Sequence, residues 1–347
     1  MRRMFLILSG EHPTLPFAEV RAILETENIA YDIIEWQGRL ARLEIKNKYV
    51  NSACNKFLKR AAMIKVYGIE LFAKSNINDL LEEIRKFDWK EIVGKRSFAV
   101  RAVNLLTNKV SVNTQDLERI IGSIIKDKTH APVNLEHPSV TIQVIVSKYT
   151  ALVGLRLGSI RRGSYDERRP KRRPFFHPSA MEPRLARVLV NLSRIKEGEI
   201  FLDPFCGSGG IMIEAGLIGC YVVGGDILSY MVRGARENLK FFGLDPGSIV
   251  LHDARALPFK NVHGIATDPP YGRSATTKGT PLPKLLKIFL NEAYEALRSR
   301  RYLVIVSPLG IRVEEYALST GFKVYEEHRI RVHRSLTRRI LVLRKGK

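Results

Sequence analysis

Strand and helix patterns alternate strictly from residue 175 until the last two predicted strands of the chain. Short apolar runs predict strands at residues 199–204, 221–226, 249–252, 264–267 and 302–306. Helical patterns separate these runs, which is typical of a parallel sheet with helices on both faces. The last two predicted strands, 322–328 and 337–343, have no helix between them and indicate an antiparallel pair. We therefore expect an α/β fold whose seven-stranded sheet ends in an antiparallel hairpin.

The first helix of this region is expected to begin at Ser179. Ser179 and Glu182 have the spacing of a capping box, in which each side chain bonds to the other's backbone amide. The apolar residues that would face the sheet follow at helical spacing; they are Leu185, Val188, Leu189 and Leu192.

Acidic residues stand at the ends of the first four predicted strands: Asp203, Asp226, Asp253 and Asp268. The carboxyl ends of parallel strands form the crevice where open α/β sheets bind ligands. Asp203 precedes a glycine-rich turn that matches neither the dinucleotide fingerprint nor a phosphate-binding Walker loop. A carboxylate there suits a ligand ammonium group, whereas Asp226 suits ribose hydroxyls and Asp253 an adenine amine. Each acid taken alone is better explained as a helix cap or a loop residue, and only the four together favour a ligand site.

The fourth acid opens the segment Asp268-Pro269-Pro270-Tyr271-Gly272. Prolines cannot continue a strand ladder, so the Asp268 carboxylate and the Tyr271 ring are expected to project into the crevice. This arrangement suits alkylation of an exocyclic amine on a nucleobase. The carboxylate and the Pro269 carbonyl would each accept one N–H, while the tyrosine stacks on the extruded base. The alternative is a proline-rich turn after a strand.

The first half of the chain mixes strand and helix patterns and carries no recognisable catalytic group. Strands are predicted at residues 5–8, 31–34, 40–45, 97–103 and 139–146, and helices at 17–27, 78–87 and 114–126. Thr114 is expected to cap the last of these helices. These patterns indicate an α+β region.

Several segments of this half resemble a THUMP domain, an RNA-binding module of tRNA-modifying enzymes. They are residues 97–101, 115–122, 133–135 with Pro138, and 151–155. The resemblance implies a contact with the acceptor end of tRNA. Lys95, Arg96 and Arg101 are then candidates for phosphate contacts, although solvated surface charge is the commoner role of such residues.

Net charge indicates a polyanionic partner. The chain carries a formal charge of +22, which concentrates polyanions around it. Nucleic acid is favoured over an acidic membrane surface or a heat-adapted lysine surplus. Arginines are concentrated between residues 156 and 173, where Gly158, Gly163 and Pro170 predict a linker without regular structure. We expect its arginines to lie along a sugar-phosphate backbone, and the alternative is a connector that is only soluble. The candidates for RNA contact in it are Arg161, Arg162, Arg168, Arg169 and Arg172.

The acids, the Asp268 segment and the stretch 173–181 together resemble one family of methyltransferases. It is the tRNA guanine-N2 methyltransferases of archaea and eukaryotes that carry an amino-terminal THUMP domain, with a Rossmann-like sheet that binds S-adenosyl-L-methionine. The resemblance assigns amine orientation to Asp268 and Pro269, and base stacking to Tyr271. It implies one or two methyl transfers to a guanosine at position ten of tRNA. The implied cofactor-binding residues are Asp203, Phe205, Gly207, Gly209, Asp226, Ile227, Asp253, Ala254, His177 and Ser179.

Two other functions stay open. A DNA adenine-N6 methyltransferase would use the same Asp268 segment, and a non-catalytic RNA-binding protein could keep a vestigial sheet. Cys206 beside the glycine turn is interpreted as a small apolar filler and not as a nucleophile, because amine methylation needs no covalent intermediate. The basic residues of the closing hairpin, Arg338 among them, could extend the RNA surface or protect the sheet edge from aggregation.

The expected organisation has four parts. They are a ferredoxin-like α+β subdomain (1–60), a THUMP domain (61–155), a basic linker (156–174) and a methyltransferase domain (175–347). The three cysteines have no metal-ligand spacing, so neither a metal nor a disulfide framework is expected. We expect no membrane partner, since the first apolar run is too short for a signal or a membrane segment. The chain is predicted to be cytoplasmic and monomeric.

Overall fold

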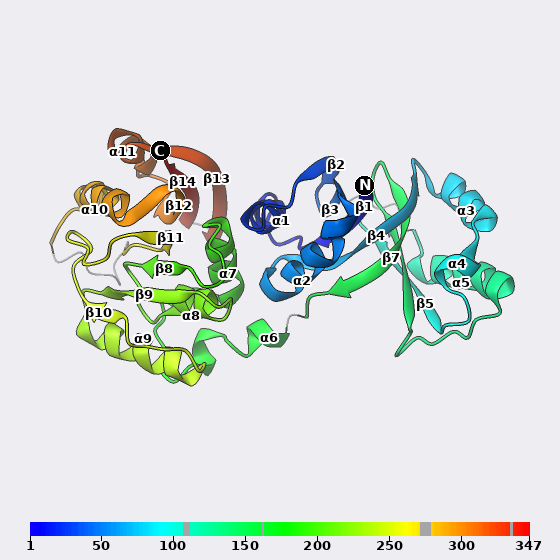
Figure 1. The fold of residues 1–347 in the computed structure, drawn as a ribbon, viewed down its shortest axis with the longest axis horizontal. Coiled ribbons are helices and arrows are strands. Elements are labelled where there is room, and N and C mark those ends of the chain that lie inside the picture. Colours follow the sequence, from blue (N-terminus) through cyan, green and yellow to red (C-terminus); the bar gives the residue numbers. More distant parts are fainter. Residues whose placement is uncertain (107–111, 162, 271–278, 334–335) are drawn as a thin grey trace. The chain divides into compact units, whose positions relative to one another are not determined.

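A computed structural model of the chain describes residues 1–106, 112–161, 163–270, 279–333 and 336–347 (Figure 1). The described residues form two compact units. The first unit comprises residues 1–11, 29–58 and 64–160, and the second comprises 12–28, 59–63 and 161–347. Each unit contains one seven-stranded sheet.

The sheet of the first unit has the order β2-β3-β1-β4-β7-β6-β5. Its strands are β1 (Arg2–Leu8), β2 (Tyr31–Gln37), β3 (Leu40–Ile45), β4 (Ile64–Lys74), β5 (Phe98–Asn104), β6 (Val140–Val146) and β7 (Ala151–Ser159). Only β5 and β6 among them pair in parallel. Strand β4 pairs with both β1 and β7, so strands from both predicted amino-terminal domains share one sheet.

Sequence patterns do not indicate β4, because polar residues and Gly68 interrupt its apolar run. The glycine has a steric reason: a Cβ at this position would lie 2.2 Å from the Leu155 carbonyl oxygen of β7.

The helices that accompany this sheet are α2 (Val50–Arg60), α3 (Ile77–Lys86), α4 (Trp89–Ile92) and α5 (Thr114–Thr129). Trp89, Phe98 and Ile121 are fully buried in a core that joins α3, α4 and α5 to β5, β6 and β7. The cap of α5 differs from the prediction, because the Asn113 side chain accepts from the amides of Gln115 and Asp116. Asn113 takes the cap position, and Thr114 is the first helical residue.

The sheet of the second unit has the order β10-β9-β8-β11-β12-β14-β13. Its strands are β8 (Ile200–Asp203), β9 (Tyr221–Asp226), β10 (Ile249–Leu251), β11 (Val262–Thr267), β12 (Leu297–Pro308), β13 (Phe322–His333) and β14 (Leu336–Lys345). Strands β10, β9, β8, β11 and β12 pair in parallel, while β14 pairs antiparallel with both β12 and β13. The predicted α/β sheet with a closing antiparallel pair is confirmed.

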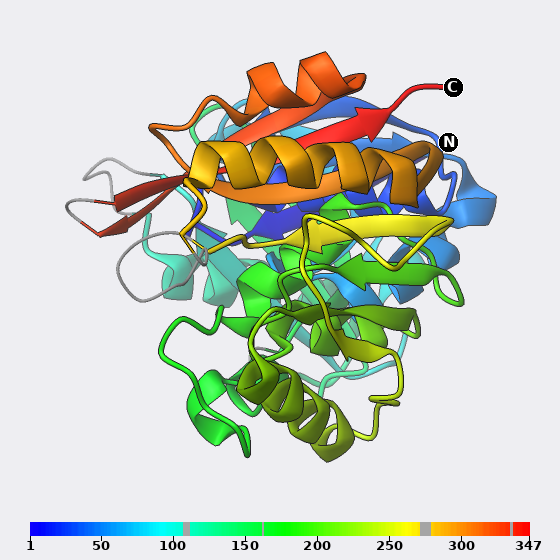
Figure 2. The same ribbon diagram turned by 90° about the vertical axis from the view of Figure 1, so that its left-hand side faces the viewer.

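Helices cover this sheet in two groups. Helix α7 (Pro183–Leu192) packs on α1 (Leu15–Thr26) and on α8 (Gly210–Gly216), and α8 packs on α9 (Ser229–Phe241). Helices α10 (Leu282–Ala296) and α11 (Val313–Thr320) pack against each other, as both views show (Figures 1 and 2). Phe289 of α10 is fully buried with Ile265 and Leu303 of the central strands. Burial of each such side chain stabilises the fold by about 1.5–3 kcal/mol, which holds the central strand ends in place.

Two local predictions for the second unit are wrong. Helix α7 begins at Pro183 instead of Ser179, because a proline starts a helix readily while it disfavours helical backbone in the residue before it. The Ser179 hydroxyl lies 2.7 Å from Nδ1 of His177 and takes no part in a capping box. The basic segment contains α6 (Gly163–Asp166) and a 3-10 turn at Pro170–Arg172. It is ordered by buried contacts, such as the Tyr165 hydroxyl that donates to the Ala61 carbonyl at 3.0 Å.

Candidate active site

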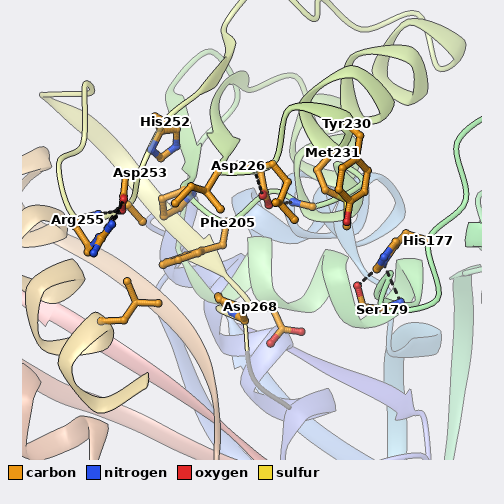
Figure 3. A pocket seen from close by; sticks show the side chains of 17 residues that line it. His177, Ser179, Phe205, Asp226, Tyr230, Met231, His252, Asp253, Arg255 and Asp268 are labelled. Carbon is orange, nitrogen blue, oxygen red and sulfur yellow. Dashed lines mark hydrogen bonds and ion pairs between the residues drawn. The ribbon is translucent and has the colours of Figure 1, made fainter. Parts of the chain in front are cut away.

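A pocket lies where the carboxyl ends of the parallel strands of the second unit meet (Figure 3). Its wall includes nine residues predicted from the sequence: His177, Ser179, Phe205, Gly207, Asp226, Ile227, Asp253, Ala254 and Asp268. It also includes residues that the sequence analysis missed, among them Tyr230, Met231, His252, Arg255, Pro270 and Leu285. The missed residues come from α9, α10 and loops, where sequence spacing gives no signal.

Asp226, at the end of β9, accepts a hydrogen bond from the glycine-rich turn that follows β8. Its Oδ2 accepts a 3.1 Å hydrogen bond from the Gly207 amide, and its Oδ1 accepts a 3.0 Å bond from the Leu228 amide. Burial raises the pKa of Asp226, and these amides act in the opposite direction. Gly207 has φ of +49° and open space around a virtual Cβ, so its backbone faces the pocket directly. A carboxylate and bare backbone thus share one wall.

Asp203 lies beneath this wall and is not among the pocket-lining residues. It is 1% exposed, and its Oδ1 accepts a 2.7 Å hydrogen bond from the Thr267 hydroxyl. Burial raises the pKa of Asp203 to about 7. Gly209 also lies outside the pocket: it has φ of +81° and a virtual Cβ 2.9 Å from Leu239, so it permits close packing of α8 on α9. The cofactor contacts of Asp203 and Gly209 stay predictions.

Asp253, the third acid, forms an ion pair with Arg255. Arg255 Nε lies 3.0 Å from Asp253 Oδ1, and Arg255 Nη2 lies 2.5 Å from Asp253 Oδ2. This arginine lowers the pKa of Asp253 and keeps the carboxylate charged. His252 lies beside Asp253 in the pocket wall (Figure 3), and its ring nitrogens are buried without a hydrogen-bond partner among the described residues. Burial lowers the pKa of His252, so the ring is neutral near pH 7.

Asp268 leaves β11 at the edge of the same pocket. Arg338 Nη1 on β14 lies 3.3 Å from Asp268 Oδ2. Pro270 lines the pocket with Asp268, while Pro269 is buried beside them. Tyr271, the predicted stacking residue, lies outside the described residues. The acid therefore faces the pocket, as expected from prolines that end a strand.

Cys206 is 5% exposed, and burial raises the pKa of its thiol well above the ordinary value. A thiol held in the protonated form is a poor nucleophile. The geometry agrees with the interpretation of Cys206 as a packing residue beneath the turn.

The candidate RNA-binding residues differ in their environments. Lys95 and Arg96 are exposed, and the guanidinium groups of Arg96 and Arg101 donate to the carbonyls of Ile92 and Leu135. Arg161, Arg169 and Arg172 are exposed, whereas Arg162 lies outside the described residues. Arg168 is held inside the second unit by Glu214, whose Oε1 lies 2.7 Å from Arg168 Nε.

The donors around the pocket fit S-adenosyl-L-methionine. Asp226 offers carboxylate oxygens for ribose hydroxyls, and Phe205, Ile227 and Leu285 offer apolar surface for an adenine ring. The ring nitrogens of His252 are buried without a hydrogen-bond partner among the described residues, and the polar atoms of a nucleoside could supply one. Within the described residues, no group of three or more His, Cys, Asp or Glu side chains could hold a metal ion. None of the helices in those same ranges is long and apolar enough to cross a bilayer.

A parallel sheet closed by an antiparallel hairpin, with acids at the strand ends around one pocket, defines the class of α/β methyltransferases. Residues 170–340 match the family model described as an RMKL-like methyltransferase domain, and residues 74–156 match the THUMP domain. TrmN from Thermus thermophilus has a similar fold, with a TM-score of 0.58 at 23% identity over 99% of both chains. SMU.472, a putative methyltransferase complexed with SAH, aligns with a TM-score of 0.53 at 17% identity over 100% of this chain and 99% of that one.

Full-length relatives identify the family. The chain is 38% identical to the tRNA (guanine(10)-N2)-dimethyltransferase of Methanothermobacter thermautotrophicus over 98% of both chains. It is 37% identical to the enzyme of that name in Pyrococcus abyssi, over 98% of this chain and 99% of the relative. The chain belongs to the family of tRNA (guanine-N2)-methyltransferases. It is an enzyme that uses S-adenosyl-L-methionine, and the resemblance inferred from the motifs is confirmed.

Proposed function

We propose that this chain methylates the exocyclic N2 amine of the guanosine at position ten of tRNA and adds up to two methyl groups. Its full-length relatives carry this activity in their names. The observation that carries the proposal for the site is the position of Asp268, which lines the same pocket as Asp226 and Asp253.

The chain's own residues would act on the amine. The lone pair of a nucleobase amine is drawn into the ring and is a poor nucleophile. The Asp268 carboxylate accepts one N–H and the Pro269 carbonyl accepts the other, which directs the lone pair towards the pocket. When bound, S-adenosyl-L-methionine supplies the methyl group, and S-adenosylhomocysteine remains after the transfer. As its new N–C bond forms, the amine gives up one proton, and the Asp268 carboxylate that already accepts this N–H would take the proton and pass it to solvent.

The cofactor would be held by the acids of the neighbouring strands. Asp226 would accept from the ribose hydroxyls and Asp253 from the adenine amine, with Ile227 and Ala254 against the ring. His177 and Ser179, which hydrogen-bond each other, would lie near the methionine end of the cofactor. The RNA would be gripped by the THUMP domain and by the exposed arginines of the basic segment.

Three further features belong to this proposal. The chain would act as a monomer, in the cytoplasm, on extruded rather than stacked guanine. Light scattering of the purified protein measures the first of these directly.

Mass spectrometry of nucleosides tests the reaction. A tRNA transcript incubated with the protein and S-adenosyl-L-methionine should yield N2-methyl- and N2,N2-dimethylguanosine, and a transcript with adenosine at position ten should yield neither. Methylation of adenine in duplex DNA, with no modified guanosine in tRNA, would favour the DNA methyltransferase instead. Binding of S-adenosylhomocysteine without any methyl transfer would favour a binding protein.

A further inference from the structure

An arginine from the closing hairpin stands against the acid of the Asp268 segment. Arg338 Nη1 lies 3.3 Å from Asp268 Oδ2. The two side chains are 23% and 19% exposed, so the pair is half-buried and still accessible to a ligand. A contact of this kind, between residues 70 positions apart, places a cation beside the group that would receive the substrate amine.

The sheet topology brings the pair together. Strand β14 runs antiparallel to β12, so its first residues lie at the edge where the parallel strands end. Arg338 is opposite Pro308, the last residue of β12, and β12 is the neighbour of β11, which Asp268 follows. The fold therefore sets Arg338 against an acid of the pocket wall, while Arg338 itself is not one of the residues that line the pocket.

Guanine and adenine differ at the edge that such a pair would meet. Guanine carries the N2 amine and the O6 acceptor, whereas adenine carries an amine donor at the position of O6. A carboxylate accepts from an amine and donates nothing, while a guanidinium has five N–H donors and accepts nothing. A guanidinium can thus serve one carboxylate and a second acceptor at the same time.

We propose that Arg338 selects guanine by donating a hydrogen bond to O6 of the base whose N2 amine is held by Asp268. This inference rests on the proposed function and names the atom by which its substrate is recognised. An adenine at the same place would direct its 6-amine at the Arg338 guanidinium. The hydrogen bond to O6 would then be lost, and two N–H donors would face each other without an acceptor.

The test uses a base that keeps the amine and lacks the acceptor. 2-Aminopurine carries the same 2-amine as guanine and has no O6. Transcripts assembled from synthetic halves would contain either guanosine or 2-aminopurine riboside at the target position. For the wild-type protein we expect kcat/KM to be at least about tenfold higher with guanosine, the usual effect of a lost hydrogen bond to a charged group.

The variants Arg338→Met and Arg338→Lys separate recognition from positioning. Arg338→Met should reduce the guanosine to 2-aminopurine ratio to near one, and Arg338→Lys should keep part of it. Equal losses on both substrates with an unchanged ratio would mean that Arg338 only positions Asp268, and would overturn the proposal. Equal wild-type rates on the two bases would overturn it without any variant.

Arg344→Met is the matched control. Arg344 lies six positions further along β14, on the same face of the strand, with its guanidinium carbon 5.5 Å from the centre of the Tyr302 ring. Its replacement should leave the ratio of the two rates unchanged. If the wild-type protein methylates neither base, the proposed function fails and not merely the inference about Arg338.

Discussion

The Thr267 hydroxyl donates a 2.7 Å hydrogen bond to Oδ1 of Asp203. This bond joins the end of β11, directly before Asp268, to the head of the glycine-rich turn after β8. Burial, together with the nearby charges of Asp226 and Asp268, raises the pKa of Asp203 to about 7, although the hydrogen bonds from Thr267 and Phe205 act in the opposite direction. The carboxyl therefore titrates in the physiological range.

Cofactor affinity should depend on the ionisation of Asp203. Its folded-state pKa lies above the ordinary value of 3.8, so its contribution to stability is complete below that value and is lost as pH rises through about 7. Only the ionised form carries the charge that can form an ion pair with a ligand ammonium group. The Kd of S-adenosylhomocysteine should fall about tenfold between pH 6 and pH 8, as the ionised fraction rises from about one tenth to nine tenths.

Calorimetry across this pH range checks the expectation. Asp203→Asn should bind more weakly and with little dependence on pH. Thr267→Val removes a donor to the ionised carboxyl and should move the transition to higher pH. The same pH dependence in Asp203→Asn as in the wild-type protein would assign the titration to another group.

Replacement of Asp268 should remove catalysis and spare cofactor binding. We expect Asp268→Ala to lower kcat by at least about a hundredfold, the usual range for the loss of a positioned polar group. The Kd of S-adenosylhomocysteine should stay within about threefold of the wild-type value, because Asp226 and Asp253 are unchanged. Single-turnover methylation of tRNA measures the first quantity, and full activity of the variant would refute the role.

A buried ion pair should make stability depend on acid pH. Arg194 donates to both Glu25 and Glu326, and its side chain is 4% exposed. Burial alone would raise the pKa of Glu326, but the His328 hydrogen bond and the charges of Arg194 and Arg21 lower it to about 2. Since the folded-state pKa is depressed, the stabilisation is present above about pH 4.5 and is lost as pH falls towards 2.

Glu326→Gln should therefore lower the free energy of unfolding by about 3 kcal/mol at pH 7. The difference from the wild-type protein should shrink below pH 4. Its exposed neighbour provides the control, because Glu327→Gln should change stability by less than about 1 kcal/mol. Urea denaturation at several pH values would measure both, and equal effects at the two positions would contradict the prediction.

The exposed arginines of the basic segment should contribute to RNA affinity through counterion release. The triple replacement of Arg161, Arg169 and Arg172 by Gln should weaken tRNA binding and reduce the slope of log Kd against log salt. Arg168 is left in place because its ion pair with Glu214 stabilises the second unit. Replacement of three exposed lysines elsewhere, Lys240, Lys260 and Lys287, matches the change in charge. An equal slope change in both variants would indicate a general effect of net charge.

For the second unit, the sequence by itself determined the order of the strands and the chemistry of the strand ends, whereas in the first unit it did not indicate β4. Apolar runs that alternate with helical patterns leave few arrangements other than a parallel sheet. Asp226, Asp253 and Asp268 follow such runs directly, so a carboxylate at the pocket edge was implied by local pattern alone. The predicted helix starts were wrong where a neighbouring residue is the better start or cap. Helix α7 begins at Pro183 instead of Ser179, and Asn113 caps α5 instead of Thr114.

Only the tertiary structure decided which distant groups meet at the site. The antiparallel return of β14 sets Arg338 against Asp268, and no spacing along the chain encodes that approach. The packed core also decides that Asp203 lies beneath the pocket wall while His252 is part of it. Burial in this core raises the pKa of Asp203. Sequence patterns report local conformation and residue chemistry, whereas contact, desolvation and pKa arise from residues that only folding brings together.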